Sequence, residues 1–471
     1  MATSDARFDV PSARKVFGEA INTSVRHDRP AQAGPQRTVD IGKHNTGINR
    51  FSISGVSRIR RGFLGTLLEP VFAAQTVAQV AIESREAAGK LKALGIAKDV
   101  QVLLDRPEDD NQEGIDVHFN CQDGSRYVIK TGVNVGDDEG TANVTGRLNN
   151  IFGGGESFEA NYARGNKTQA AFQGILSMPV DADPQKQLEM SASQATLDNR
   201  PYSSHDEVRR TLSTAYRASH FGGLSHELRY SASWREICNV GYRASPSLRS
   251  EAGHSLKSSM LYTVAYDDRD SHTVPTCGSL VKATAEIAGL LGDVRFAKVQ
   301  AELQSNQQIT NSEFVLSTGL QGGILWSQGR SSMSDRFSLG GLTSVRGFEH
   351  RGIGPRDGND SIGGDVFYAA GISLLTPLPY IRTSALKGHV WANAGQLALL
   401  DDRGLLRDRG GSSAADEIYR FFMRPSAAVG VGLVYRHSMV RVELSCCLPM
   451  LATTTDRPKS GLQFGLGVQF L

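Results

Sequence analysis

The sequence predicts a mostly β protein: a transmembrane antiparallel β-barrel of about 16 strands, preceded by one small α+β module. From about residue 125 to residue 471, apolar and polar residues alternate with a period of two between turn-rich breaks. The alternating segments are about 9 to 11 residues long, which is the length that a tilted strand needs to cross the hydrocarbon layer. About 345 residues, at about 20 for each strand and its loop, give roughly 16 strands.

A large soluble antiparallel sheet with one hydrated face is the alternative explanation of this alternation. The sequence favours the membrane barrel, because closure in lipid removes the sheet edges that would otherwise aggregate. A bundle of transmembrane helices is excluded, since no stretch of about 18 uncharged apolar residues occurs in the sequence.

The composition argues against several other classes of protein. The chain carries 51 Lys and Arg against 49 Asp and Glu, a net charge of +2, which does not favour nucleic-acid binding. Its five cysteines include no C-x-x-C pair, so we expect no zinc site. The eleven histidines are scattered, and neither G-x-S-x-G nor H-E-x-x-H occurs. We therefore expect no catalysed chemistry, no metal and no cofactor.

The first part of the chain, residues 1–48, is polar and interrupted by prolines, and it is typical of a flexible leader. It contains no apolar core of signal-peptide length, so we do not expect export through a cleaved signal.

Residues 49–124 indicate the α+β module, in the order strand, helix, helix, strand, strand. Residues 51–59 predict the first strand, and residues 64–94 are rich in good helix formers. We expect Pro70 and Gly89 to divide this helical stretch and Gly95 to end it. Two short strands are expected at residues 100–104 and 115–119.

The barrel half, residues 125–471, contains one segment that is more specific than a periodic strand. It begins with Asp335-Arg336-Phe337-Ser338-Leu339-Gly340-Gly341 and continues with Val345-Arg346-Gly347-Phe348. This segment resembles the signature loop of the BamA superfamily of barrel-assembly proteins. The resemblance implies that Arg346 lies on a loop folded back into the barrel lumen, where a planar guanidinium suits a carboxylate or an amide.

Further motifs narrow the resemblance to the mitochondrial branch, the central barrel subunits of the sorting and assembly machinery. Residues 146–156 resemble that branch's early hairpin, and residues 352–357 and 374–379 resemble its segments after the signature loop. The module at residues 49–124 resembles a single polypeptide-transport-associated (POTRA) repeat.

The resemblance also suggests where the partner of Arg346 would lie, although this sequence departs from the family pattern there. The family's partner strand shows an aromatic residue, then Asp, then Gly at alternate positions, whereas this chain has Trp391, Asn393 and Gly395. Asn393 would offer only a neutral amide, so Asp365 is the alternative carboxylate that we expect for Arg346.

The last strand resembles the β-signal of mitochondrial barrel precursors through Gln463, Gly465, Val468 and Phe470. We expect residues 127–135 to form the first barrel strand and to pair with residues 461–470. Glycines weaken packing along this last strand, which would leave a seam that can open.

Together these features predict an insertase that folds β-barrel precursors into the mitochondrial outer membrane through that seam. The resemblance implies accessory subunits of the sorting and assembly machinery as partners, and it places the POTRA-like module in the intermembrane space. The lipid bilayer is the remaining expected partner. A passive outer-membrane pore and a plastid or bacterial protein-translocating relative are the alternatives.

Overall fold

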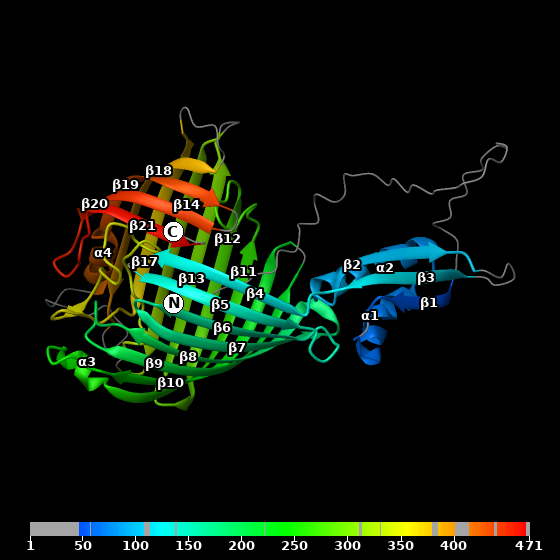
Figure 1. Cartoon of the computed structure of the whole chain (residues 1–471). Coiled ribbons are helices and arrows are strands. Elements are labelled where there is room, and N and C mark those ends of the chain that lie inside the picture. The colour runs from blue at the N-terminus through cyan, green and yellow to red at the C-terminus, as the bar shows by residue number, and fades with distance from the viewer. Residues whose placement is uncertain are drawn as a thin grey trace. The chain divides into compact units, whose positions relative to one another are not determined.

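The computed structural model describes residues 47–56, 58–107, 114–136, 139–220, 222–309, 313–329, 331–378, 385–400, 414–437 and 440–467. The chain divides into two compact units (Figure 1). The described residues up to Arg126 form most of the first unit, and most of the remaining chain forms the second. Nearly all of the expected leader, residues 1–46, lies outside the described residues.

The first unit is a three-stranded sheet with two helices, in the order that the sequence predicts. Its elements are β1 (Ile48–Ser54), α1 (Arg61–Ala73), α2 (Val77–Ala93), β2 (Ala97–Asp105) and β3 (Ile115–Asp123). The central strand β3 pairs parallel with β1 and antiparallel with β2. Apolar residues from both helices and the sheet form one buried core, which includes Val71, Val80, Leu91, Val117 and Phe119.

The expected helix breaks at Pro70 and Gly89 are wrong, because both residues lie inside helices. The chain breaks instead near Thr76, whose hydroxyl caps α2 by accepting a hydrogen bond from the backbone N–H of Gln79. Proline removes one backbone donor from α1, but burial of neighbouring residues such as Val71 outweighs that loss. Gly95 follows α2 with a φ of +69°, the left-handed conformation of a helix terminus.

The second unit is a closed barrel of sixteen antiparallel strands, which confirms the prediction of about 16. The expected first strand is also confirmed as β4. The barrel strands are β4 (Tyr127–Gly136), β5 (Glu139–Asn149), β6 (Ser157–Gly165), β7 (Thr168–Val180), β8 (Asp183–Asp198), β9 (Asp206–Ser219), β10 (Leu224–Cys238), β11 (Gly253–Asp267), β12 (Gly278–Gly292), β13 (Phe296–Gln308), β14 (Val315–Ser327), β17 (Val366–Pro377), β18 (Leu386–Ala398), β19 (Ser426–His437), β20 (Val440–Leu451) and β21 (Gly461–Gly467).

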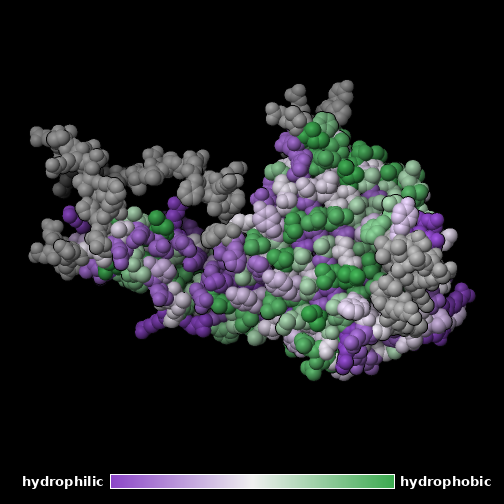
Figure 2. All heavy atoms as spheres, turned by 180° about the vertical axis from the view of Figure 1, so that it is seen from behind, coloured by the Kyte–Doolittle hydropathy of each residue, from purple (hydrophilic) through white to green (hydrophobic). Residues whose placement is uncertain are grey.

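The period-two pattern separates an apolar outer wall from a polar interior. On β20, for example, Glu443 and Ser445 are fully buried on the inward face, whereas Leu444 and Leu448 are exposed on the outward face. Apolar side chains gather on the barrel wall in Figure 2. A transmembrane barrel requires this arrangement, because its outer wall contacts lipid.

The remaining elements lie in the connections between barrel strands. They are α3 (Pro246–Ser250), α4 (Ala414–Met423) and the small hairpin of β15 (Arg356–Asp357) and β16 (Asp360–Ser361). Among the residues that the structure describes, none of the helices combines the length and the apolar composition of a membrane-crossing helix.

Candidate functional site

The long connection between β14 and β17 is packed against the inward face of the barrel strands. We call its residues 331–365 the luminal loop. Leu339, Val345 and Phe348 of this loop are almost completely buried, and they share one apolar cluster with Trp391 of β18 and Ala428 of β19. The luminal loop therefore behaves as part of the barrel core rather than as a surface connection.

The two glycines of the motif shape the first turn of the loop. Gly340 and Gly341 have φ values of +105° and +115°, which residues with a Cβ rarely adopt. The N–H of Gly340 donates to Ser344 Oγ at 3.0 Å, and the N–H of Gly341 donates to the carbonyl of Val345 at 3.1 Å. These bonds close a compact turn immediately before Arg346.

Asp335 ties the beginning of the luminal loop to strands β10, β11 and β13. Its carboxylate lies 2.9 Å from Arg235 Nη1 and 3.1 Å from Lys257 Nζ, and Lys298 Nζ donates to its backbone carbonyl at 2.8 Å. Burial by itself would raise the pKa of Asp335, but Lys257 and Arg235 outweigh burial and hold that pKa below its usual value. The Lys298 ammonium also lies 4.2 Å from the ring centre of Phe337.

Asp365 does not pair with Arg346, and its contacts hold the end of the loop instead. It accepts hydrogen bonds from Ser331 Oγ at 2.6 Å and from the N–H of Leu400 at 3.1 Å, and it lies 3.8 Å from Arg336 Nε. Asp335 thus ties the start of the loop to the barrel wall, and Asp365 joins the end of the loop to its start through Ser331 and Arg336.

Arg346 pairs with Glu443 of β20. Its Nε donates to Glu443 Oε1 at 2.9 Å, and its Nη2 lies 3.5 Å from Oε2. The exposed fractions of Arg346 and Glu443 are 1% and 0%, so this ion pair is removed from solvent. Arg441 and Ser445, on the same face of β20, donate to the same carboxylate at 2.8 and 3.0 Å. The guanidinium also lies 5.4 Å from the ring centre of Trp391.

The expected partners of Arg346, Asn393 and Asp365, are therefore wrong. Asn393 is buried, but its side-chain amide makes no hydrogen bond in the part of the chain that the structure describes. A signal for Glu443 was present in the sequence, because it is an inward-facing acid between Arg441 and Ser445 on an otherwise apolar strand. The alternation assigns it to the lumen, but it does not indicate which part of the loop reaches it.

The tip of the luminal loop is hydrogen-bonded to the last two strands and their connection, residues 440–467, which we call the closing hairpin. The N–H of Gly347 lies 3.4 Å from Gln463 Oε1, and its carbonyl accepts from the N–H of Lys459 at 2.8 Å. Gly465 lies directly opposite Glu443 in the register of β20 and β21. The structure thus brings Arg346, Gly347, Gln463 and Gly465 together, whereas Val468 and Phe470 lie outside the described residues.

The two sides of the closing strand β21 differ in how far they pair. With β20, its register runs continuously from Gly461 opposite Cys447 to Gly467 opposite Arg441. With the first strand, β4, the described register is the single pair of Leu466 and Val135. This pair closes the barrel between its first and last strands, and residues 468–471 lie outside the described residues.

The fold and the loop define a class: a closed transmembrane β-barrel whose long luminal loop is fixed by a buried arginine. The Omp85 superfamily domain matches residues 150–470 of the chain. A SAM50-like protein of Schizosaccharomyces pombe is 31% identical over 440 residues, covering 90% of this chain and 91% of that relative. The chain belongs to the Omp85 superfamily and, within it, to the family of sorting and assembly machinery component 50 proteins.

Vertebrate relatives agree with this assignment, and a solved bacterial structure shares the fold. Sorting and assembly machinery component 50 homolog A of Xenopus laevis is 33% identical over 435 residues, 90% of each chain, and the human homolog is 32% identical over the same length. BamA from Haemophilus ducreyi lacking POTRA domains 1-3 has the same fold, with a TM-score of 0.75 at 16% identity. That match covers 90% of this chain and 84% of the BamA chain.

We predict that Glu443→Gln loosens the luminal loop. The substitution removes the carboxylate that faces Arg346 and Arg441, and removing one partner of a buried ion pair costs about 3–5 kcal/mol. Hydrogen exchange at the amides of residues 345–349 in the purified full chain measures this effect, and we expect loss of protection. Glu349→Gln is the matched control, because Glu349 is half-exposed and 3.7 Å from Arg457. Equal protection in the two variants would contradict the prediction.

We also predict that Gly347→Ala displaces the loop tip. Gly347 has a φ of +82°, and a Cβ there would lie 2.7 Å from the Cβ of Ala428. Gly329→Ala is the control, because Gly329 has a similar φ of +88° but open space around it. Both variants incur backbone strain of about 1 kcal/mol, and only Gly347→Ala adds a clash with the wall. Protease cleavage within the loop should therefore increase in Gly347→Ala alone; similar cleavage in both variants would refute the steric argument.

Proposed function

We propose that this chain folds β-barrel precursors and inserts them into the mitochondrial outer membrane, through the seam between β4 and β21. Its family supports the assembly role, since the relatives are named as components of a sorting and assembly machinery. The observation that carries the seam is the strand order, in which the first and last barrel strands, β4 and β21, are neighbours with Val135 opposite Leu466.

The physical argument begins with the cost of an open barrel edge. Parting β4 from β21 leaves backbone N–H and C=O groups unpaired in lipid, and each such group costs several kcal/mol. Among the described strands, β4 and β21 are the neighbouring pair that is not consecutive along the barrel, so they can part while every other strand keeps its neighbour. A precursor strand can then pair with the exposed edge by β-augmentation and restore the lost hydrogen bonds. No nucleotide or catalysed reaction is part of this mechanism.

The luminal loop would position the closing hairpin during this exchange. Arg346 holds β20 through Glu443, and Gly347 holds β21 and its preceding turn through Gln463 and Lys459. In this role Asp335, Phe337, Gly340 and Gly341 support the loop from its base, and Asp365 fixes its return. The loop would thus keep one side of the seam in place while the other side moves.

The remaining parts of the proposal concern partners and orientation. Accessory subunits of the sorting and assembly machinery would recognise the β-signal of the precursor. The first unit, residues 48–123, would act as a POTRA-like module in the intermembrane space, either as a spacer or as a guide for precursors. Its strand order, with β3 between β1 and β2, leaves the outer edges of β1 and β2 for such contacts.

The seam is tested by locking it with a disulfide. Val135 and Leu466 are directly opposite each other, which places their Cα atoms about 4.5–5.5 Å apart, within the range of a disulfide. In a background without the exposed Cys277 and Cys446, Val135→Cys with Leu466→Cys should crosslink and stop precursor insertion until it is reduced. The control pair Ala232→Cys with Ser258→Cys crosslinks β10 to β11 instead. Full activity with the seam locked would refute the mechanism.

The loop is tested by Arg346→Ala in cells depleted of the natural chain. We expect newly imported porin to stall before it reaches its folded form, although the variant barrel itself still folds. Arg295→Ala, an exposed arginine in a turn of the same barrel, should support normal assembly. A passive pore predicts the opposite: normal porin assembly and an unchanged steady conductance in the Arg346→Ala barrel.

A further inference from the structure

The outer wall of the barrel contains a hollow that the proposed insertion mechanism does not use. It has a volume of about 890 Å³ and extends over strands β5 to β11. Its large apolar lining residues belong to the exposed, outward-facing set of the barrel, namely Val144, Tyr162, Phe172, Leu212, Trp234 and Leu256. The hollow is therefore open to the side of the wall that contacts lipid.

One cation lies in this apolar surface. Arg210 lines the hollow, is exposed, and has the same outward orientation on β9 as Leu212. In the described part of the chain Arg210 makes no ion pair. The nearest acid on this face, Glu236, is in register with Val208 and lies 4.0 Å from His254 instead.

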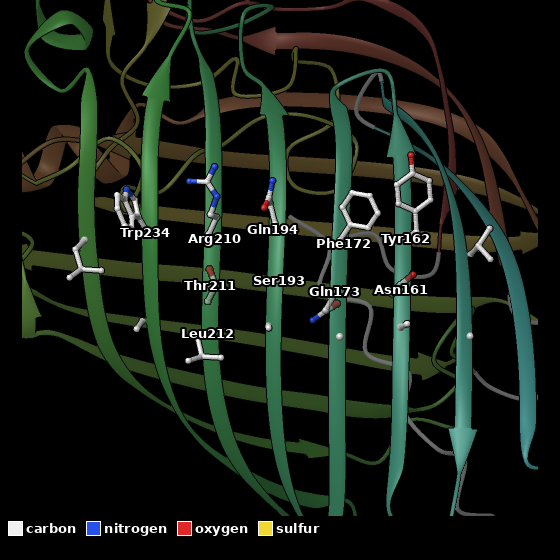
Figure 3. Close-up of a pocket in the computed structure, with 17 residues that line it drawn as sticks. Asn161, Tyr162, Phe172, Gln173, Ser193, Gln194, Arg210, Thr211, Leu212 and Trp234 are labelled. Carbon is white, nitrogen blue, oxygen red and sulfur yellow. The ribbon is translucent and has the colours of Figure 1, made fainter. Parts of the chain in front are cut away.

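The neighbours of Arg210 form a row that is suited to a headgroup. Gln194 of β8 and Trp234 of β10 are both directly opposite Arg210 in the sheet register. Figure 3 shows this row continuing through Phe172 to Tyr162, with the guanidinium between the amide of Gln194 and the ring of Trp234. The rings of Tyr162 and Phe172 lie 4.8 Å apart. A cation and an amide thus adjoin aromatic and aliphatic surface on one wall.

Arg210 lies nearer to the N-terminal end of its strand than to the C-terminal end. It is the fifth residue of β9, so it lies about 13 Å along the strand from the end near β8, and less in depth because barrel strands tilt. An arginine on the lipid face costs about 2–4 kcal/mol at the bilayer midplane but only about 0–1 near the interface. Its guanidinium can extend toward the phosphate layer, and a tryptophan beside it is typical of that layer.

We propose that this hollow is a binding site for an anionic phospholipid. Arg210 and Gln194 would hold the phosphate of the headgroup, and the surface around Phe172, Leu212 and Leu256 would hold acyl chain. The hollow reaches β5, the strand beside β4, but the headgroup ligands Arg210 and Gln194 lie on β9 and β8, further along the wall from the seam. The proposal is independent of insertion activity.

Tryptophan quenching tests the site in the intact chain. The protein is placed in phosphatidylcholine nanodiscs that contain brominated phosphatidylglycerol or, in parallel, the same fraction of brominated phosphatidylcholine. Trp326→Phe removes the other exposed tryptophan, so that Trp234 reports on the hollow while Trp391 stays buried in the lumen. We expect stronger quenching by the anionic lipid.

Substitutions then assign the preference to the guanidinium. Arg210→Gln should reduce the preference for the anionic lipid about five-fold, the equivalent of about 1 kcal/mol for one basic residue at an anionic surface. Arg210→Lys should keep it, and so should Arg164→Gln, which removes another exposed arginine on β6 outside the hollow. Heat-modifiable migration confirms that each barrel is folded. Equal quenching by both lipids, or equal losses in the two glutamine variants, would identify ordinary surrounding lipid and overturn the proposal.

Discussion

The buried contact between Arg346 and Glu443 is the interaction on which the arrangement of the barrel interior depends. Both side chains are withdrawn from water, and Glu443 is the carboxylate that compensates the buried charge of Arg346. Because Arg346 is on the luminal loop and Glu443 is on the wall, satisfying the pair requires the loop to lie inside the barrel. The apolar residues beside Arg346 then pack on the same wall, and the glycines around it permit the close approach. This ion pair fixes the middle of a loop of more than thirty residues, and Asp335 fixes its start.

The loop connects two regions of the barrel that are distant in the sheet. Asp335 is bound by cations from β10 and β11, near the middle of the strand order, whereas Arg346 is bound by β20, next to the closing strand. The loop is tied to both, and its backbone continues into hydrogen bonds with the turn before β21. In the proposed mechanism this connection explains why the seam can open without loss of the whole barrel. The hairpin beside the seam remains anchored from within, while β4 is held to its partner β5 by an ordinary register.

The sequence predicted the barrel and its motif more completely than it predicted the contacts across the lumen. Period-two alternation reports which face of a strand is apolar, and together with the length of the alternating region it gives the approximate number of strands. The same pattern places Glu443 inside, but 97 positions separate it from Arg346, and no local rule relates the two. The family pattern predicted Asn393 as a partner of Arg346, but the buried amide of Asn393 makes no hydrogen bond among the described residues. The helix break was expected at Pro70 and lies near Thr76, because core packing outweighs the one backbone hydrogen bond that proline removes. The outer hollow depends on the curvature of seven neighbouring strands, which sequence alternation does not encode.

The central claim is that a precursor strand pairs with the opened edge of β4, and disulfide capture tests it most directly. A precursor arrested during import carries one cysteine in its last strand, and the chain carries Val135→Cys in the background without Cys277 and Cys446. The cysteine is placed at successive positions of the precursor strand. The account predicts that the crosslink to position 135 is strongest at one of these positions and that its yield alternates with a period of two on either side of it. Crosslinks that form equally well to an outward position on β10, or that show no register, would contradict the account.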